Sequence, residues 1–140
     1  MTKWISCLAL LFVTVGCGQH PVDEARSIQD DFANEFCSCP DVVSSGGYAN
    51  KDACVAENRS NITDSEADCL KAAYDRNESA ASGPIKCIID LYKQVKDCVK
   101  DASCNSAALA ACGSSFDPDS CPALPDSVQE EFNACFPTGP

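Results

Sequence analysis

Twelve cysteines in a chain of 140 residues constrain what this protein can fold into more than any other feature of its sequence. A cysteine content near a tenth is typical of exported domains held together by disulfides, because thiols stay reduced in the cytosol. Cys7 and Cys17 lie in the N-terminal segment, and the other ten form an even set that can pair completely. We expect these ten residues to be half-cystines: Cys37, Cys39, Cys54, Cys69, Cys87, Cys98, Cys104, Cys112, Cys121 and Cys135.

The apolar content of the chain explains why it needs cross-links. From Cys17 onward only 21 of 124 residues are Ile, Val, Leu or Phe, and the formal net charge of −11 becomes −12 when Lys3 is removed. So few large aliphatic residues together with so high a charge are typical of disordered chains. Five disulfides, at about 2–4 kcal/mol each, would offset the missing burial by restricting the unfolded chain. We therefore expect one small domain whose stability depends more on disulfides than on a packed apolar core.

The first residues have the pattern of an export signal. Met1-Thr2-Lys3 is a short positive start, and an uncharged, mostly apolar run from Trp4 to Val15 follows it. A membrane-spanning helix needs about 20 apolar residues, so this run is too short to remain as an anchor by itself. The acidic balance of the chain also argues against partners that attract basic proteins, and we expect no nucleic-acid binding.

Residues 13–17, Val-Thr-Val-Gly-Cys, resemble the lipobox of bacterial lipoproteins, although Thr14 stands where that pattern prefers Leu. The resemblance implies a signal peptide at 1–16, a lipidated Cys17 with a tether at 17–22, and a cysteine-rich domain at 23–140. Gly18 after the modified cysteine indicates the outer membrane in a host that sorts by this residue. The alternative is ordinary secretion with cleavage after Gly18.

The local pattern is helical throughout, and it predicts an all-α bundle of about five or six short helices. In the first half of the chain we expect a helix from Pro21 with Ile28, Phe32 and Phe36 on one face, a loop from Val42 to Gly47, and a helix at 51–58 capped by Asn50. The capping box Thr63 to Glu66 should begin the next helix, which should break at Ser82-Gly83-Pro84. In the second half we expect a helix with Pro84 in its first turn, a short helix from Ser106 to Cys112 ended by Gly113, and a last helix capped by Asp126 or Ser127.

Two of the half-cystines have a spacing that excludes one pairing. Cys87 and Cys98 are eleven residues apart, which is three helical turns, so they share a face of the expected helix at a separation of about 16 Å. A disulfide tolerates about 4.4–6.8 Å between its Cα atoms. The two cysteines must therefore bond to partners on other segments, beside opposite ends of this helix.

The residue types do not point to a catalytic site. His20 is the only histidine, and it falls in the expected tether, so we expect no imidazole inside the domain for a nucleophile–base pair or a zinc site. The Cys37-Ser38-Cys39 pair is expected at a helix C-terminus, where the helix dipole disfavours a redox-active thiolate. No segment has the oxygen spacing of a calcium loop. We expect no catalytic residue, metal or cofactor.

The cysteine spacing and the export signal together resemble the uncharacterised cysteine-rich lipoproteins of myxobacteria and related bacteria. The spacing is Cys37-x-Cys39, Cys54, Cys69, Cys87-x10-Cys98-x5-Cys104-x7-Cys112, Cys121 and Cys135. The resemblance implies a lipid-anchored, helical, disulfide-stapled envelope protein, and it implies no activity.

Two functions are compatible with these features. The first is a non-enzymatic interaction or structural module that contacts the membrane through its lipid and binds an envelope or extracellular protein. The alternative is a carrier of a small apolar ligand, held between the apolar faces of the helix from Pro21 and the helix from Pro84.

Overall fold

The computed structural model describes residues 18–136, which form helices without any strand. The expected all-α class is confirmed, with seven α-helices and one short 3-10 turn in this part of the chain. The signal peptide and Cys17 lie outside the described residues. The elements are α1 (Pro21–Phe36), α2 (Pro40–Ser45), α3 (Lys51–Asn58), α4 (Asp64–Arg76), α5 (Glu78–Asp101), α6 (Ser106–Ser114), η1 (Pro118–Ser120) and α7 (Asp126–Asn133).

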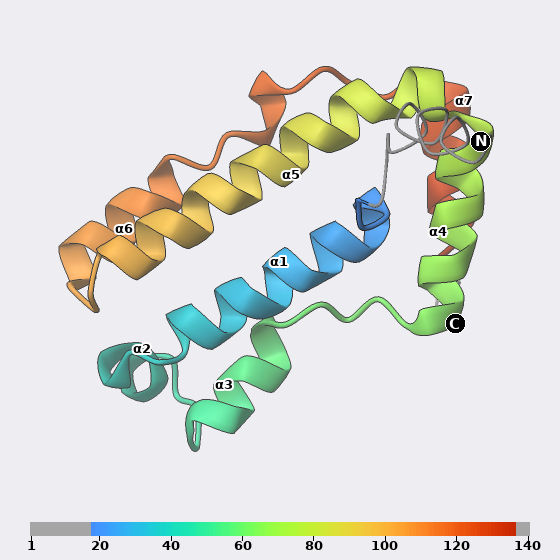
Figure 1. Cartoon of the computed structure of the whole chain (residues 1–140). Helices are drawn as coiled ribbons and strands as arrows, with labels where there is room; N and C mark the ends of the chain where they lie inside the picture. The colour runs from blue at the N-terminus through green and yellow to red at the C-terminus, as the bar shows by residue number, and fades with distance from the viewer. Residues whose placement is uncertain (1–17, 137–140) are drawn as a thin grey trace, which may run out of the picture.

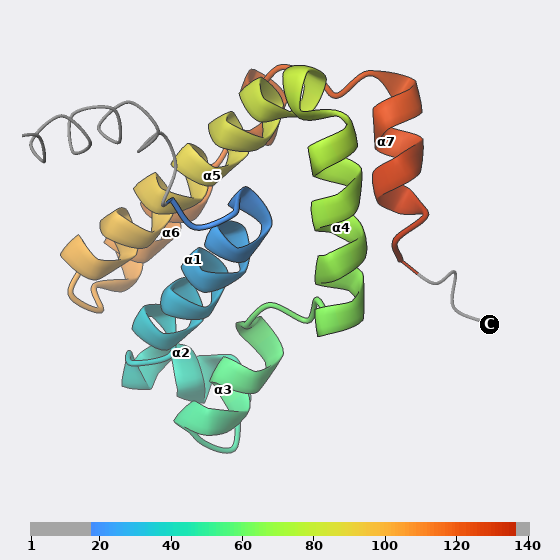
Figure 2. The ribbon, with the colours of Figure 1, turned by 45° about the vertical axis from the view of Figure 1, so that its right-hand side comes forward.

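Helices α1 and α5 form the centre of the fold. They run side by side in the same general direction and make the most extensive helix–helix contact in the structure (Figures 1 and 2). Helix α6 lies along α5, whereas α4 stands across one end of the central pair with α7 beside it. Helices α2 and α3 lie at the opposite end, against the C-terminal part of α1. The bundle therefore has two distinct ends.

All ten cysteines between 37 and 135 are joined in five disulfides, and all five have Cα–Cα distances of 5.2–5.8 Å. Cys87 and Cys98 bond to different partners, as their helical spacing required. Cys87 lies near the middle of α5 and not at its end, because the helix begins at Glu78. Four pairs have at least one cysteine inside a helix, and Cys39–Cys104 joins two connecting segments. The pairs are Cys37–Cys54, Cys39–Cys104, Cys69–Cys135, Cys87–Cys121 and Cys98–Cys112.

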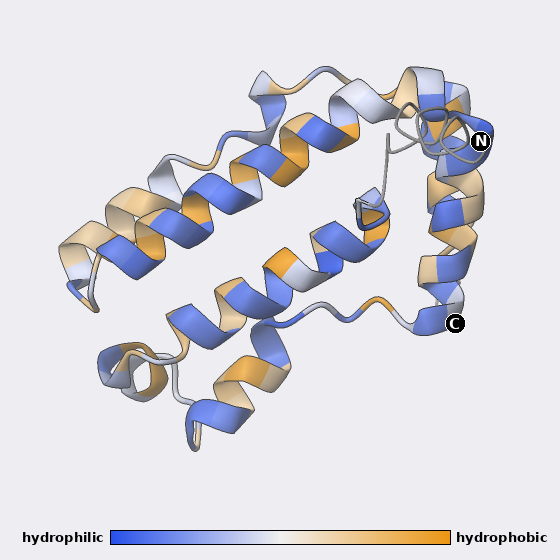
Figure 3. Cartoon of the chain, viewed as in Figure 1, coloured by the Kyte–Doolittle hydropathy of each residue, from blue (hydrophilic) through white to orange (hydrophobic). Residues whose placement is uncertain are grey.

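The buried apolar side chains form three small clusters instead of one core. One cluster lies between α5 and α6 around Val95 and Val99, and the Phe32 and Phe36 rings of α1 pack against it. The other two lie around Leu70 and Tyr74 on α4. Figure 3 shows the same distribution, with hydrophobic residues in short patches on several helices. This arrangement agrees with the low aliphatic content of the chain.

Local capping signals set two of the helix starts that the sequence predicted. The Asn50 side chain accepts a hydrogen bond from the Ala53 backbone N–H at 2.9 Å and begins α3. At the start of α4, Thr63 and Glu66 form the complete capping box, in which each side chain accepts from the other residue's backbone N–H. These bonds satisfy backbone donors that have no partner inside the helix.

The loop predicted from Val42 to Gly47 is wrong, because residues 40–45 form helix α2. Pro40 stands in the first turn, where its missing N–H costs nothing, and Cys39 precedes it as the N-cap. The disulfide to Cys104, 65 residues further along the chain, fixes this start. A long-range bond thus supports a helix that the Val-Val-Ser-Ser sequence by itself does not favour.

The break predicted at Ser82-Gly83-Pro84 is also wrong, because α5 begins at Glu78 and continues through Pro84. Proline inside a helix costs about 3 kcal/mol, so tertiary packing must compensate. Ala81 is completely buried in the cluster that also holds Tyr74 and Val128, and this packing favours the helical start of α5. The chain turns instead at Asn77, between α4 and α5.

Two further helix limits differ from their predictions. Helix α6 does not end at Gly113 but runs to Ser114, and it begins with an Asn105 side chain that accepts from the Ala108 N–H. Helix α7 has Pro125 as its N-cap residue, so Asp126 and Ser127 are inside the helix and do not cap it.

Candidate functional site

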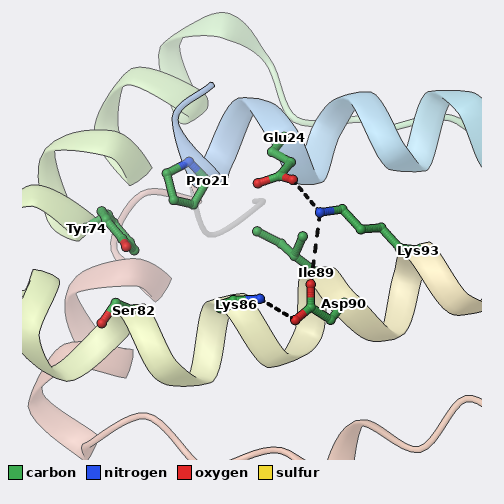
Figure 4. Close-up of a pocket in the computed structure, with 8 residues that line it drawn as sticks. All are labelled: Pro21, Glu24, Tyr74, Ser82, Lys86, Ile89, Asp90 and Lys93. Carbon is green, nitrogen blue, oxygen red and sulfur yellow. Dashed lines mark hydrogen bonds and ion pairs between the residues drawn. The ribbon is translucent and has the colours of Figure 1, made fainter. Parts of the chain in front are cut away.

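A cleft of about 350 Å³ lies where α1, α4 and α5 meet, and it brings carboxylate, ammonium and hydroxyl groups together (Figure 4). Its apolar floor comes from Pro21 at the start of α1 and from Ile89 on α5. The other lining residues are polar: Glu24, Tyr74, Ser82, Lys86, Asp90 and Lys93. We call it the α1–α4–α5 cleft.

Four charged side chains form a ladder along the cleft. Lys93 Nζ lies 2.6 Å from Glu24 Oε1 and 4.0 Å from Asp90 Oδ1, and Lys86 Nζ lies 2.6 Å from Asp90 Oδ2. The order Glu24, Lys93, Asp90, Lys86 alternates in sign, as Figure 4 shows, so the ladder is neutral as a whole. The four charges therefore cancel within the ladder.

These contacts shift the titration of two members of the ladder. The hydrogen bond from Lys86 lowers the pKa of Asp90, and the Lys86 and Lys93 charges lower it further. The hydrogen bond to Glu24 raises the pKa of Lys93. Both shifts favour the charged forms, so the alternation of signs persists at neutral pH.

Two hydroxyl groups line the α4 side of the cleft. Tyr74 is 92% buried through its ring, and burial together with the Glu78 and Asp75 charges raises the pKa of its phenol, which stays protonated. Ser82 is exposed on the neighbouring turn of α5. Neither hydroxyl is bonded to another residue of the cleft (Figure 4), so each has a donor to offer.

The placement of His20 corrects the sequence prediction, because its imidazole belongs to the domain. The ring Nδ1 caps α1 by accepting from the Val22 N–H at 3.2 Å, and Nε2 lies 3.3 Å from Asp75 Oδ1. The ring also meets Tyr74 edge to face, with 5.2 Å between centroids. Since Nδ1 accepts, Nε2 carries the proton and donates to Asp75. Both nitrogens are engaged, which leaves neither to act as a base toward Ser82.

Several acidic side chains elsewhere in the domain have local structural contacts. Asp64 pairs with Arg26 at 3.0 Å, Asp30 accepts from the Ser60 backbone N–H, and Glu66 serves the capping box. Within residues 18–136, no group of three His, Cys, Asp or Glu side chains is placed to hold a metal ion. Cys37 and Cys39 do not bond to each other, since each joins a distant cysteine.

The faces that suggested an apolar carrier are occupied. Phe32 and Phe36 of α1 and Val95 and Val99 of α5 share one cluster with side chains of α6. A second cleft between α1 and α5 is lined by charged and amide groups, among them Glu35 and Lys96. A groove of about 450 Å³ beside α7 is largely apolar, with Ile85, Leu124 and Phe132 among its lining residues.

The sequence did not indicate the α1–α4–α5 cleft. Its ladder joins residues of one helix at a three- or four-residue spacing to Glu24 of another helix. The Lys86, Asp90 and Lys93 spacing is typical of any solvated helix face, and only the approach of α1 turns it into a cleft.

None of the described helices is both long and apolar enough to cross a membrane. No family model matches the chain, and neither a curated protein nor a solved structure matches it.

Proposed function

We propose that this protein is exported, anchored to the bacterial envelope by acyl chains on Cys17, and active there as a non-enzymatic interaction module. The observation that supports export most strongly is the complete pairing of the ten cysteines between 37 and 135. Such a network persists in oxidising compartments. It also needs no contribution from Cys17, which supports a separate role for that residue.

The position of His20 makes the proposed anchor short. Because His20 caps α1 and contacts α4, the folded domain begins at residue 20, not at residue 23. Three residues at about 3.5 Å each would then separate Cys17 from the domain, which would hold the start of α1 within about 10 Å of the acylated cysteine. The α2–α3 end would point away from the bilayer.

The α2–α3 end, residues 37–59, is the surface we propose for a partner protein. Apart from its three half-cystines, this segment buries no side chain, yet two disulfides hold it. Cross-links that fix an exposed polar surface reduce the ordering cost of binding. An envelope or extracellular protein is the partner class that an anchored, outward-facing surface would meet.

The structure gives the apolar carrier less support, since the faces of α1 and α5 that would hold the ligand pack against each other and α6. The clefts beside this contact are lined by ion pairs or amides. A bound lipid-sized mass in native mass spectrometry of the exported protein would favour the carrier over the module.

Detergent partition tests the anchor. We expect the wild-type protein to enter the detergent phase of a Triton X-114 extract and the Cys17→Ser variant to stay in the aqueous phase. Cys7→Ser is the matched control, because Cys7 is removed with the signal peptide and its loss should not change the partition. Wild-type protein recovered entirely from the aqueous phase would contradict lipidation and favour ordinary secretion.

A further inference from the structure

We propose that the Cys39–Cys104 disulfide is a redox switch, which a dithiol reductant opens before the other four disulfides and which then releases helix α2 while the rest of the fold stays in place. The redox property depends only on this disulfide and its surroundings. Its use to control a partner rests on the α2–α3 surface proposed above, where a released α2 would have to be ordered again on binding.

The turn that carries Cys104 has a backbone conformation that its residues do not favour. Ser103 and Cys104 have φ angles of 47° and 64°, and within residues 18–136 they are the only residues other than glycine with a positive φ. The Asn105 N–H closes the turn on the Ala102 carbonyl at 2.9 Å. Two successive positive φ angles are typical of type I′ turns, in which Gly, Asn and Asp dominate because other side chains crowd the backbone. The disulfide thus closes on a strained turn.

The Cys39–Cys104 bond also differs from the other four in what it joins. Neither of its cysteines lies inside a helix or belongs to an apolar cluster. Helix α2, which begins directly after Cys39, buries no side chain. Opening the bond therefore frees α2 and lets the turn relax without removing a side chain from any cluster. Strained disulfides are the more easily reduced ones, and this bond has the least packing to keep it closed.

The different burial of the two cysteines determines which sulfur is attacked. Cys104 is partly exposed, whereas Cys39 is 2% exposed, so a thiolate of the reductant attacks Cys104 Sγ. A mixed disulfide forms at Cys104, and Cys39 leaves as a thiolate that takes up a proton. The second thiolate of the reductant then displaces Cys104, and the reductant departs as its own disulfide. Two electrons pass to the protein, which gains two thiols.

The remaining contacts allow the bond to close again. Helices α1 and α5 run side by side in the same direction, so the segments that follow them and carry Cys39 and Cys104 are at the same end of the bundle (Figures 1 and 2). Cys37–Cys54 holds both flanks of the released segment. The two thiols therefore keep a high effective concentration toward each other, which makes the switch reversible.

A redox titration of the exported protein tests the proposal. The protein is equilibrated in graded ratios of reduced to oxidised dithiothreitol, its thiols are alkylated, and each disulfide is quantified by peptide mass spectrometry. We expect Cys39–Cys104 to be half-reduced at a ratio at least about tenfold lower than any other pair. The strongest competitor is Cys87–Cys121, because both of its cysteines are partly exposed. If that pair opens first, or if all five open together, the proposal is overturned.

Hydrogen exchange at the ratio that opens only Cys39–Cys104 tests what the switch releases. The amides of α2 should lose protection while those of α1 and α5 keep it. Loss of protection in all three helices would mean that the bond holds the whole fold, which contradicts a local switch. Neither measurement involves a partner, so a failure of the proposed partner surface would leave both results unchanged.

Two serines that directly precede a half-cystine form a matched pair for testing the strain. Ser103→Gly should raise the half-reduction ratio of Cys39–Cys104 at least about threefold, because glycine adopts a positive φ without a steric cost. Ser120 precedes Cys121 and is also exposed, but its φ is not positive. Ser120→Gly should therefore not raise the ratio for Cys87–Cys121. An unchanged ratio in Ser103→Gly, or an equal rise in both variants, contradicts strain in the turn as the cause of easy reduction.

Discussion

The two ends of the bundle are held together by different means. The α2–α3 end, residues 37–59, buries only Cys37, Cys39 and Cys54, and two disulfides fix it. The α4–α7 end, residues 62–81 and 124–135, has one internal disulfide, Cys69–Cys135, and the two apolar clusters around α4. Cross-links therefore replace an apolar core at the α2–α3 end and supplement one at the α4–α7 end.

The reason lies in where the few aliphatic residues fall. Leu70, Ala73 and Tyr74 recur at helical spacing on α4 and meet Val128 and Phe132 of α7. On the exposed side of this pair, Arg76 Nε and Nη2 both donate to Glu131 Oε2, at 3.1 and 3.0 Å. The α2–α3 end has no comparable set, so its order depends on covalent bonds.

Full reduction of the disulfides should have the largest effect on the two ends of the bundle. We expect excess reductant to abolish most of the helical circular dichroism at moderate temperature, because the aliphatic content of the chain does not support a stable core without cross-links. Residual hydrogen-exchange protection should be confined to α4 and α7. Full helicity in excess reductant would mean that packing is sufficient at both ends.

Two disulfides form a natural matched pair for a sharper test. Cys39–Cys104 and Cys69–Cys135 close loops of 65 and 66 residues, so the loss of either should lower the free energy of unfolding by a similar amount, about 4 kcal/mol. Their local effects should differ. The double variant Cys39→Ala, Cys104→Ala should lose exchange protection in α2, because no apolar cluster supports that helix, whereas Cys37–Cys54 still holds α3.

The partner variant, Cys69→Ala with Cys135→Ala, should keep α4 protected by its apolar contacts. Hydrogen exchange followed by mass spectrometry measures both patterns. An equal loss of hydrogen-exchange protection at the two ends would contradict the conclusion that they are stabilised by different means.

A smaller effect is expected from truncating apolar side chains. Leu70→Ala should lower the free energy of unfolding by about 2–5 kcal/mol, because the Leu70 side chain is 94% buried between α4 and α7. Val43→Ala on α2 is the control, and it should cost less than about 1 kcal/mol, since the side chain is only half-buried outside any cluster. Urea denaturation measures both. A cost at Val43 equal to that at Leu70 would show that the α2–α3 end has a packed core.

The smallest effect concerns the capping box at the start of α4. The Thr63 backbone N–H lowers the pKa of Glu66 below its ordinary value of 4.5. The stabilisation is therefore present above pH 4.5 and is lost as the pH falls through the lower pKa of the folded state. Glu66→Gln should melt at most a few degrees lower than wild type at pH 7. The two proteins should converge at pH 2, and a difference that persists there would mean that the carboxylate charge is not what stabilises the cap.

The features that the sequence predicted correctly depend on interactions between residues a few positions apart in the chain. The Asn50 cap and the Thr63–Glu66 box act across three residues, and the helical spacing of Cys87 and Cys98 is enough to exclude a bond between them. The expected break before Pro84 failed because the competing contribution, burial of Ala81 against Val128, comes from residues far along the chain.

The sequence by itself determined the helical class, the export pattern and the need for cross-links, because composition and local spacing act on the chain before it folds. The tertiary structure alone decided which cysteines pair, since ten cysteines allow on the order of 10³ pairings and loops of 14 to 66 residues separate the partners. It also brought His20 into the domain and placed Glu24 beside Lys93 across the α1–α4–α5 cleft. These contacts join residues on different helices, and their formation depends on how the helices meet.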